Sequence, residues 1–159
     1  MLNDQAFLGL GSNIGDSIEW LRFGLERLPK PQLVSPVYST EPVGGPEQDN
    51  FMNLVVQIEW VDSPESLLEL CQSIEQQAGR TREVENGPRT LDIDILLMGD
   101  RLIGSPDLMV PHPAMFERNF VMKPLLDIWP SFVETDLFAA NYEPEPIGDV
   151  TKLGLIEAL

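Results

Sequence analysis

Two amphipathic helix patterns, separated by strand patterns, constrain the fold of this chain more than any other feature. Residues 17–28 carry apolar side chains at three- and four-residue steps, and Pro29 ends that pattern. Residues 64–78 carry a second apolar stripe, with Ser63 as the candidate N-cap and Gly79 just beyond the end. Each predicted helix must bury its apolar face against another layer of structure.

Four strand patterns accompany the helices. Residues 6–10 and 91–99 contain short apolar runs, 51–61 alternates between two faces, and 33–40 contains Pro36. Because proline cannot donate a ladder hydrogen bond, residues 33–40 are expected at a sheet edge or a bulge. The order strand, helix, strand, strand, helix, strand predicts an α+β fold, a ferredoxin-like sandwich whose antiparallel sheet is covered by two helices on one face.

The length of 159 residues favours a single domain over residues 1–159. A short helix is expected at 122–127. Residues 131–159 contain six acidic residues and one lysine, with weak hydrophobic periodicity. We therefore expect this stretch to be a C-terminal appendage that says little about function.

The charge balance excludes several classes of partner. Ten Lys and Arg residues face 26 Asp and Glu residues, which gives a formal net charge of −16. Nucleic acids and anionic membranes bind basic surfaces, so neither is an expected partner. No apolar run suits a membrane span, the first residues lack the basic start of a signal peptide, and Cys71 is the only cysteine. We expect a cytoplasmic protein that acts on small molecules, as a monomer, with a dimer left open.

Asp92 and Asp94 are the first candidates for chemistry. Residues two apart on a strand point to the same face, so the two carboxylates should project together. Their mutual repulsion is relieved when a cation lies between them, and Mg²⁺ commonly takes one or two carboxylates together with phosphate oxygens. The alternative is a solvated polar end of an edge strand.

Three arginines lie close to this pair in the sequence. Arg80 and Arg82 follow the second helix, and Arg89 precedes Asp92 by three residues. Guanidinium groups bind phosphate bidentately and stay charged at working pH. The pattern favours a polyphosphate held between metal and arginine, although simple surface pairing with Glu83 and Glu85 would also account for it.

Other candidates are weaker when taken alone. His112 is the only histidine, and a lone histidine is more often structural than functional. The loop at 11–16 could bind phosphate, but it lacks a P-loop lysine and is better explained as a tight turn before a helix. Phe51, Asn53 and Phe120 could line a flat pocket or belong to the core.

Four segments together carry a resemblance to a known family. They are LGLGSNIGD at 8–16, VYSTEPVGGPEQDNFMN at 37–53, GPRTLDIDILLMG at 87–99 and VPHPAMFERNFVMKPL at 110–125. The chain resembles the 6-hydroxymethyl-7,8-dihydropterin pyrophosphokinases of folate biosynthesis. The likeness covers residues 6 to about 130.

The resemblance implies transfer of a pyrophosphoryl group from ATP, the co-substrate, to the hydroxymethyl group of the reduced pterin, with release of AMP. It assigns two Mg²⁺ ions to Asp92 and Asp94, and catalytic contacts with the phosphates to Arg80 and Arg89. The ATP-binding positions are Gln72, Glu75, Arg82, Arg89, His112 and Arg118. The pterin-binding positions are Thr40, Val43, Phe51, Asn53 and Phe120, with the ring stacked between the two phenylalanines.

Two departures from the family pattern bear on the nucleotide. Residues 83–86, EVEN, place negative charge where many members of the family carry a basic or aromatic residue, and Asp107 stands in a stretch where some members have an arginine. This predicts weak affinity for ATP, and it leaves open a non-catalytic homologue that binds pterin or nucleotide without transfer. A small regulatory module of the same fold would not account for the combination of aspartates, arginines and His112.

Overall fold

One antiparallel sheet forms the centre of the computed structural model, which describes residues 4–42, 48–79 and 90–159. Strand β1 (Gln5–Ser12) lies between β4 (Phe51–Glu59) and β5 (Asp92–Met98). Strands β3 (Val37–Thr40) and β8 (Val150–Gly154) extend the sheet beyond β4, giving the order β5-β1-β4-β3-β8 with every pair antiparallel. The first four strands of this order are arranged as in a ferredoxin-like sandwich, which confirms the predicted fold class.

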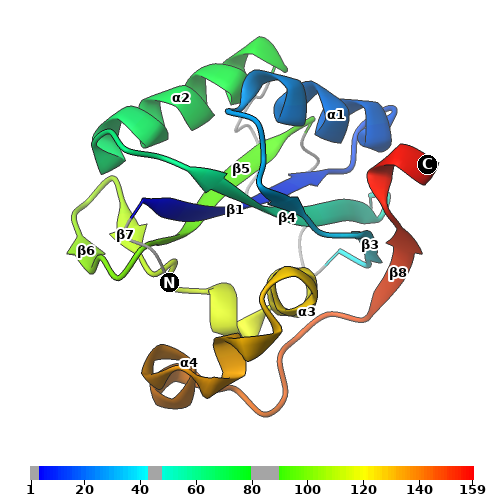
Figure 1. Cartoon of the computed structure of the whole chain (residues 1–159). Helices are drawn as coiled ribbons and strands as arrows, with labels where there is room; N and C mark the ends of the chain where they lie inside the picture. Colours follow the sequence, from blue (N-terminus) through cyan, green and yellow to red (C-terminus); the bar gives the residue numbers. More distant parts are fainter. Residues whose placement is uncertain (1–3, 43–47, 80–89) are drawn as a thin grey trace.

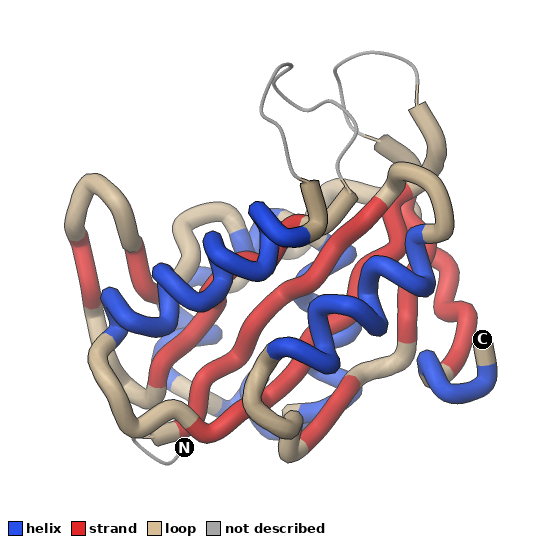
Figure 2. Tube along the Cα trace, turned by 90° about the horizontal axis from the view of Figure 1, so that it is seen from above, coloured by secondary structure: helices blue, strands red, loops and turns tan. Residues whose placement is uncertain are grey.

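Helices α1 (Ser17–Arg27) and α2 (Pro64–Gln77) cover one face of the sheet (Figure 1) and lie side by side across its strands (Figure 2). Their predicted ends are confirmed. The side chains of Asp16 and Ser63 cap the two helices, each accepting a hydrogen bond from the backbone N–H three residues further on. Gly79, with φ of +74°, follows α2 in the left-handed conformation that suits glycine.

Pro36 interrupts the predicted strand at 33–40. The structure has two short strands there, β2 (Leu33–Val34) and β3, both paired with β4. Between them the Ser35 hydroxyl accepts a hydrogen bond from the backbone N–H of Val55 at 2.9 Å. A side chain thus satisfies a donor of β4 at the point where the strand pairing is broken.

The opposite face of the sheet carries a second layer, in which α3 (Asn119–Ile128) and α4 (Asp136–Asn141) lie (Figure 1). Helix α3 contains the predicted residues 122–127 and begins three residues earlier. Its apolar residues pack with the fully buried Phe132. In the described part of the chain, no helix combines the length and hydrophobicity that a membrane span requires.

The remaining elements are short. Strands β6 (Ile103–Gly104) and β7 (Met109–Val110) form a separate hairpin. Three single-turn helices, η1, η2 and η3, occupy Met115–Glu117, Pro130–Glu134 and Ile156–Ala158.

The expectation of a C-terminal appendage is wrong. Strand β8 pairs with β3 inside the main sheet, and Phe132 and Ile156 are buried in the two hydrophobic clusters. The sequence hides this because β8 is an edge strand of largely exposed residues. Strand β8 is held in place by backbone hydrogen bonds, which any sequence can make. Its residues therefore do not alternate between apolar and polar, and the sequence contains no strand pattern there.

Candidate active site

The site is built where the glycines of β1 lie between Asn53 of β4 and the two aspartates of β5. Gly9 and Gly11 are the register partners of Asp94 and Asp92 on β5, and Gly11 is also the partner of Asn53 on β4. A Cβ atom at Gly11 would lie 2.5 Å from Oδ1 of Asn53, so any side chain there would displace the Asn53 amide. The missing side chains of β1 therefore leave space between Asn53 and the aspartates.

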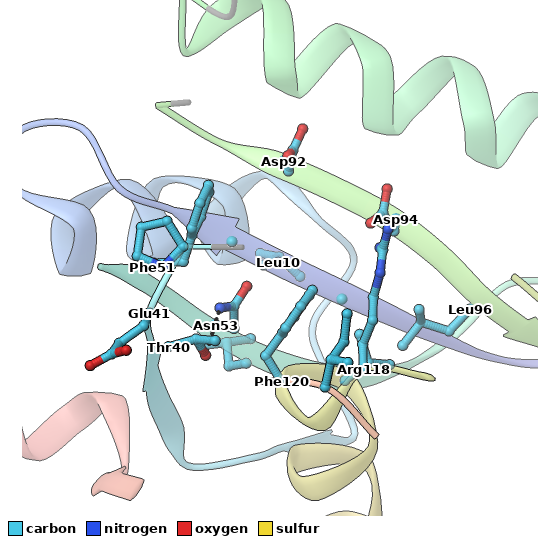
Figure 3. A pocket seen from close by; sticks show the side chains of 16 residues that line it. Leu10, Thr40, Glu41, Phe51, Asn53, Asp92, Asp94, Leu96, Arg118 and Phe120 are labelled. Atoms are coloured by element: carbon cyan, nitrogen blue, oxygen red, sulfur yellow. Dashed lines mark hydrogen bonds between the residues drawn. The ribbon is translucent and has the colours of Figure 1, made fainter. Parts of the chain in front are cut away.

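That space is a cavity of about 360 Å³. Thr40, Phe51, Asn53 and Phe120, the predicted pterin-binding residues that the structure describes, all line it together with Asp92 and Asp94. Figure 3 shows the two aspartates next to each other along β5, and the Arg118 side chain extending toward Asp94. The structure thus brings together residues from four separate segments of the chain.

A second cavity, of about 430 Å³, lies on the other side of β5. Gln72 and Glu75 of α2 line it, together with His112 from the segment after β7. Asp92 and Asp94 line this cavity as well. The carboxylate pair therefore stands where two separate cavities meet.

His112 faces the carboxylate pair from the second cavity. Its Nδ1 accepts a hydrogen bond from the backbone N–H of Ala114 at 3.2 Å, so a neutral ring carries its proton on Nε2. Nε2 lies 4.0 Å from Oδ2 of Asp94. Burial lowers the pKa of His112 below its ordinary value; Asp94 opposes this shift, and Arg118 adds to it. The neutral imidazole therefore directs an N–H donor toward the site.

Comparison with known proteins gives a consistent result. Residues 7–130 match the family of 7,8-dihydro-6-hydroxymethylpterin-pyrophosphokinase (HPPK). The chain belongs to the HPPK family. A 2-amino-4-hydroxy-6-hydroxymethyldihydropteridine pyrophosphokinase of Bacillus subtilis is 43% identical over 151 residues, which are 92% of this chain and 90% of that protein. A protein of the same name from Pseudomonas aeruginosa is 42% identical over 131 residues, 79% of this chain and 81% of its own.

A solved structure supports the fold. The Plasmodium falciparum HPPK-DHPS triple mutant with STZ-DHP superposes with a TM-score of 0.61 at 16% sequence identity. The match covers 97% of this chain and 42% of the Plasmodium chain. The similarity therefore extends over nearly the whole chain, at the level of the fold.

Glu75 lines the second cavity and also makes a hydrogen bond to the backbone of β5. It is only 6% exposed, and its carboxylate accepts a hydrogen bond from the backbone N–H of Ile93 at 2.9 Å. Strand β5 is the sheet edge, so this N–H has no neighbouring strand to pair with. Glu75 thereby fixes the backbone between Asp92 and Asp94.

Arg118 lines the first cavity rather than the second. Its guanidinium lies 5.5 Å from the centre of the Phe120 ring, within the range of a cation–π contact. Together with the orientation toward Asp94, this places a positive charge beside the carboxylate pair. Its predicted contact with ATP stays a prediction.

Four predicted site residues lie outside the described residues. They are Val43, Arg80, Arg82 and Arg89. The roles that the resemblance gives them, in binding the pterin and the phosphates, therefore stay predictions. The same holds for the acidic stretch at 83–86.

The donor set fits a magnesium ion that keeps part of its shell for phosphate and water. Asp92 and Asp94 supply two carboxylates from one strand face, and the Asp94 side chain is 45% exposed. Among the described residues, no group of three or more His, Cys, Asp or Glu side chains could enclose a metal ion alone. Two open carboxylates between two ligand-sized cavities match the coordination habit of Mg²⁺ better than a closed, all-protein site.

The loop after β1 serves as a turn, as predicted. The side-chain amide of Asn13 donates to Oε1 of Gln48 at 2.7 Å and to the carbonyl oxygen of Asp49 at 3.0 Å. These bonds tie the turn to the segment that leads into β4. They favour the tight-turn interpretation over a phosphate-binding loop.

Sequence reasoning missed three kinds of cavity residue. Gly9 and Gly11 could have been found from the alternation of glycine and leucine in β1, which marks one face without side chains. Leu96 continues the face of the two aspartates along β5. Ile147 comes from the C-terminal region, and no local pattern in the sequence signals its position.

Proposed function

We propose that the chain transfers a pyrophosphoryl group from ATP to 6-hydroxymethyl-7,8-dihydropterin and releases AMP, a step of folate biosynthesis. The observation that carries the proposal is that Asp92 and Asp94 line two cavities at once. Membership of the HPPK family and the names of the relatives support it. We name the first cavity the pterin cavity and the second the nucleotide cavity, after the substrates proposed for them.

The pterin cavity offers aromatic faces and polar groups. Phe51 and Phe120 supply faces on which a flat heterocycle can stack. Asn53 is almost fully buried, and its Nδ2 lies 3.5 Å from the hydroxyl of Thr40. A buried amide and hydroxyl are suited to recognise the polar edge of the ring, because a wrong ligand would leave them unpaired. The proposal adds Val43 to this set.

The nucleotide cavity presents groups that can bind ATP. The proposal gives Gln72, Glu75 and His112 contacts with the nucleotide, and the Nε2–H of His112 can donate to a phosphate oxygen near Asp94. Arg82 and Arg118 are proposed to bind the phosphates as well. Arg80 and Arg89 are proposed as the catalytic arginines, which would stabilise negative charge as it develops on the transferred group.

Asp92 and Asp94 would hold two Mg²⁺ ions, the number that the resemblance implies. When bound, Mg²⁺ would neutralise part of the charge of the triphosphate and hold the triphosphate in one orientation. The hydroxymethyl oxygen would lose its proton to solvent and form a bond to the β-phosphorus, while the bond from that phosphorus to the bridging oxygen breaks and this oxygen leaves with AMP. The two cavities meet at the carboxylates, so both substrates are positioned by the same strand.

We further propose that residues 1–159 act as one domain on these small molecules, in the cytoplasm and as a monomer. The net charge of −16 supports the expectation that neither nucleic acid nor membrane is a partner.

The test is AMP release from ATP, with and without the pterin and Mg²⁺, by the chain and by an Asp92→Ala/Asp94→Ala variant. We expect AMP only when pterin, metal and both aspartates are present. Asp100→Asn is the matched control, because Asp100 is exposed in the turn after β5 and lines neither cavity. No AMP, with pterin binding still visible by fluorescence, would instead favour the non-catalytic homologue.

A further inference from the structure

We propose that residues 146–148 form the outer wall of the pterin cavity, with Ile147 as an additional pterin-contacting residue and Asn119 as the residue that positions it. The inference rests on the proposed function, since it names a further contact for the same substrate. Ile147 lies beyond residues 7–130, the stretch that matches the HPPK family.

Ile147 is an apolar side chain at the rim of the cavity. It lines the pterin cavity together with Thr40, Arg118 and Phe120. It is 53% exposed, whereas five of the other nine isoleucines are buried. A flat ligand stacked on Phe120 would cover part of this surface and gain the free energy of burying it.

Four hydrogen bonds hold the wall against the start of α3. The backbone N–H of Ile147 donates to the carbonyl oxygen of Glu117 at 2.7 Å, and the N–H of Asn119 donates to the carbonyl oxygen of Ile147 at 3.0 Å. The Asn119 side-chain amide donates to the carbonyl oxygens of Pro146 at 3.1 Å and Gly148 at 3.0 Å. Asn119 stands between Arg118 and Phe120, so the turn that presents two cavity residues also holds the wall.

Gly148 brings the wall close to residues on both sides of the cavity. Its φ of +104° is a left-handed conformation that side chains rarely adopt. A Cβ built at this position would lie 3.6 Å from Cγ2 of Thr40 and 3.9 Å from Cδ1 of Phe120. A side chain at this position would therefore contact one pterin-cavity residue from β3 and one from α3, and glycine lets the wall pass close to both.

Strand β8 anchors the wall at its other end. Strand β8 lies beside β3 (Figure 1), and Val150 at its start is the register partner of the cavity residue Thr40. Further along β8, Nζ of Lys152 lies 3.2 Å from Oδ1 of Asp127 on α3, and the Tyr38 hydroxyl donates to the same carboxylate. The C-terminal region therefore contacts α3 at residues 146–148 and again at Lys152, and it pairs with β3 from Val150 onward. These contacts hold the wall relative to both elements.

The first experiment compares Ile147→Ala with the unchanged chain in steady-state kinetics. We expect KM for the pterin to rise roughly five- to tenfold, and KM for ATP to stay within about twofold, because the truncated side chain lies in one cavity only. Leu153→Ala is the matched control, since Leu153 is a half-exposed residue of β8 outside the cavity lining. Ile147→Val, which keeps most of the apolar surface, should largely restore the pterin KM.

The second experiment tests Asn119 as a positioning residue. Asn119→Ala should raise the pterin KM without raising the ATP KM, and the double variant Asn119→Ala/Ile147→Ala should be little worse than either single variant, because both remove the same contact. If Asn119→Ala fails to fold, the two KM values of Ile147→Ala alone test the inference. An unchanged pterin KM in Ile147→Ala, or equal rises in both KM values, would overturn the inference while the unchanged chain still releases AMP. Failure of the proposed function would show first, as absence of AMP release by the unchanged chain.

Discussion

The two cavities that meet at Asp92 and Asp94 are built in different ways. The pterin cavity is enclosed by backbone pairing: β1, β4 and the end of β3 form its floor, and α3 and the segment around Ile147 close its side. The nucleotide cavity is formed by side chains of α2 and by the segment 106–113 after β6, packed beside the outer edge of β5.

Because of this difference, the shape of the pterin cavity depends on the backbone, whereas the nucleotide cavity depends on individual side chains. A cavity whose floor is made of paired strands is set by the fold itself, and its glycines leave a flat space that suits a flat ligand. The nucleotide cavity depends on polar side chains such as Gln72, Asp107 and His112. We therefore expect substitutions to affect the two substrates separately everywhere except at the shared carboxylates.

The largest effect is expected at the point where the cavities meet. Asp94→Ala should lower the rate of AMP formation by roughly a thousandfold or more, because it removes a ligand of the proposed metal that both substrates share. Its thermal midpoint should stay unchanged or rise, since one of two neighbouring negative charges is gone. Activity assays and calorimetric unfolding measure the two quantities. A large fall in the midpoint would instead make Asp94 a structural residue.

Gly11→Ala should impair the pterin side alone. Its Cβ would lie 2.5 Å from Oδ1 of Asn53, so the Asn53 amide must move. We expect pterin affinity to fall roughly ten- to hundredfold, with ATP-analogue affinity unchanged, in fluorescence and calorimetric titrations. Gly9→Ala is the matched comparison: its Cβ would meet Leu96 at an ordinary 3.6 Å, so the loss should be smaller. Equal losses in the two variants would contradict the role given to Asn53.

Glu75→Ala should act on the nucleotide side and on stability. It leaves the backbone N–H of Ile93 without the acceptor that the structure gives it, which should cost about 1–3 kcal/mol in denaturant unfolding. KM for ATP should rise more than KM for the pterin. Glu75→Gln retains an acceptor oxygen and should recover most of the stability. A fully stable Glu75→Ala variant would show that this bond contributes little.

The sequence predicted the two long helices and the four strand regions from their periodic apolar faces and short apolar runs. The face shared by Asp92 and Asp94 followed from strand geometry alone. The pterin residues Phe51, Asn53 and Phe120 needed the resemblance, because aromatic residues at such spacing are usually core. Strand β8 and Ile147 escaped prediction, since exposed edge strands and cavity rims are fixed by long-range hydrogen bonds that no local pattern records.

The smallest effect concerns Cys71, a residue on the buried face of α2. Burial, with the carboxylates of Glu75 and Asp94 adding to it, raises the pKa of this thiol to about 12. The thiol therefore stays protonated at pH 9, where an ordinary cysteine is substantially ionised. Alkylation at that pH should be negligible in the folded chain and complete after denaturation. Rapid labelling of the folded chain would mean that α2 separates readily from the sheet.

The central claim is that one carboxylate pair serves two cavities, and a crystal structure of the chain with pterin, a non-hydrolysable ATP analogue and Mg²⁺ tests it most directly. We predict the pterin against Phe51 and Phe120, the nucleotide beside Gln72 and His112, and metal bound by Asp92 and Asp94 between them. Metal bound away from these aspartates, or both ligands on one side of β5, would contradict the account.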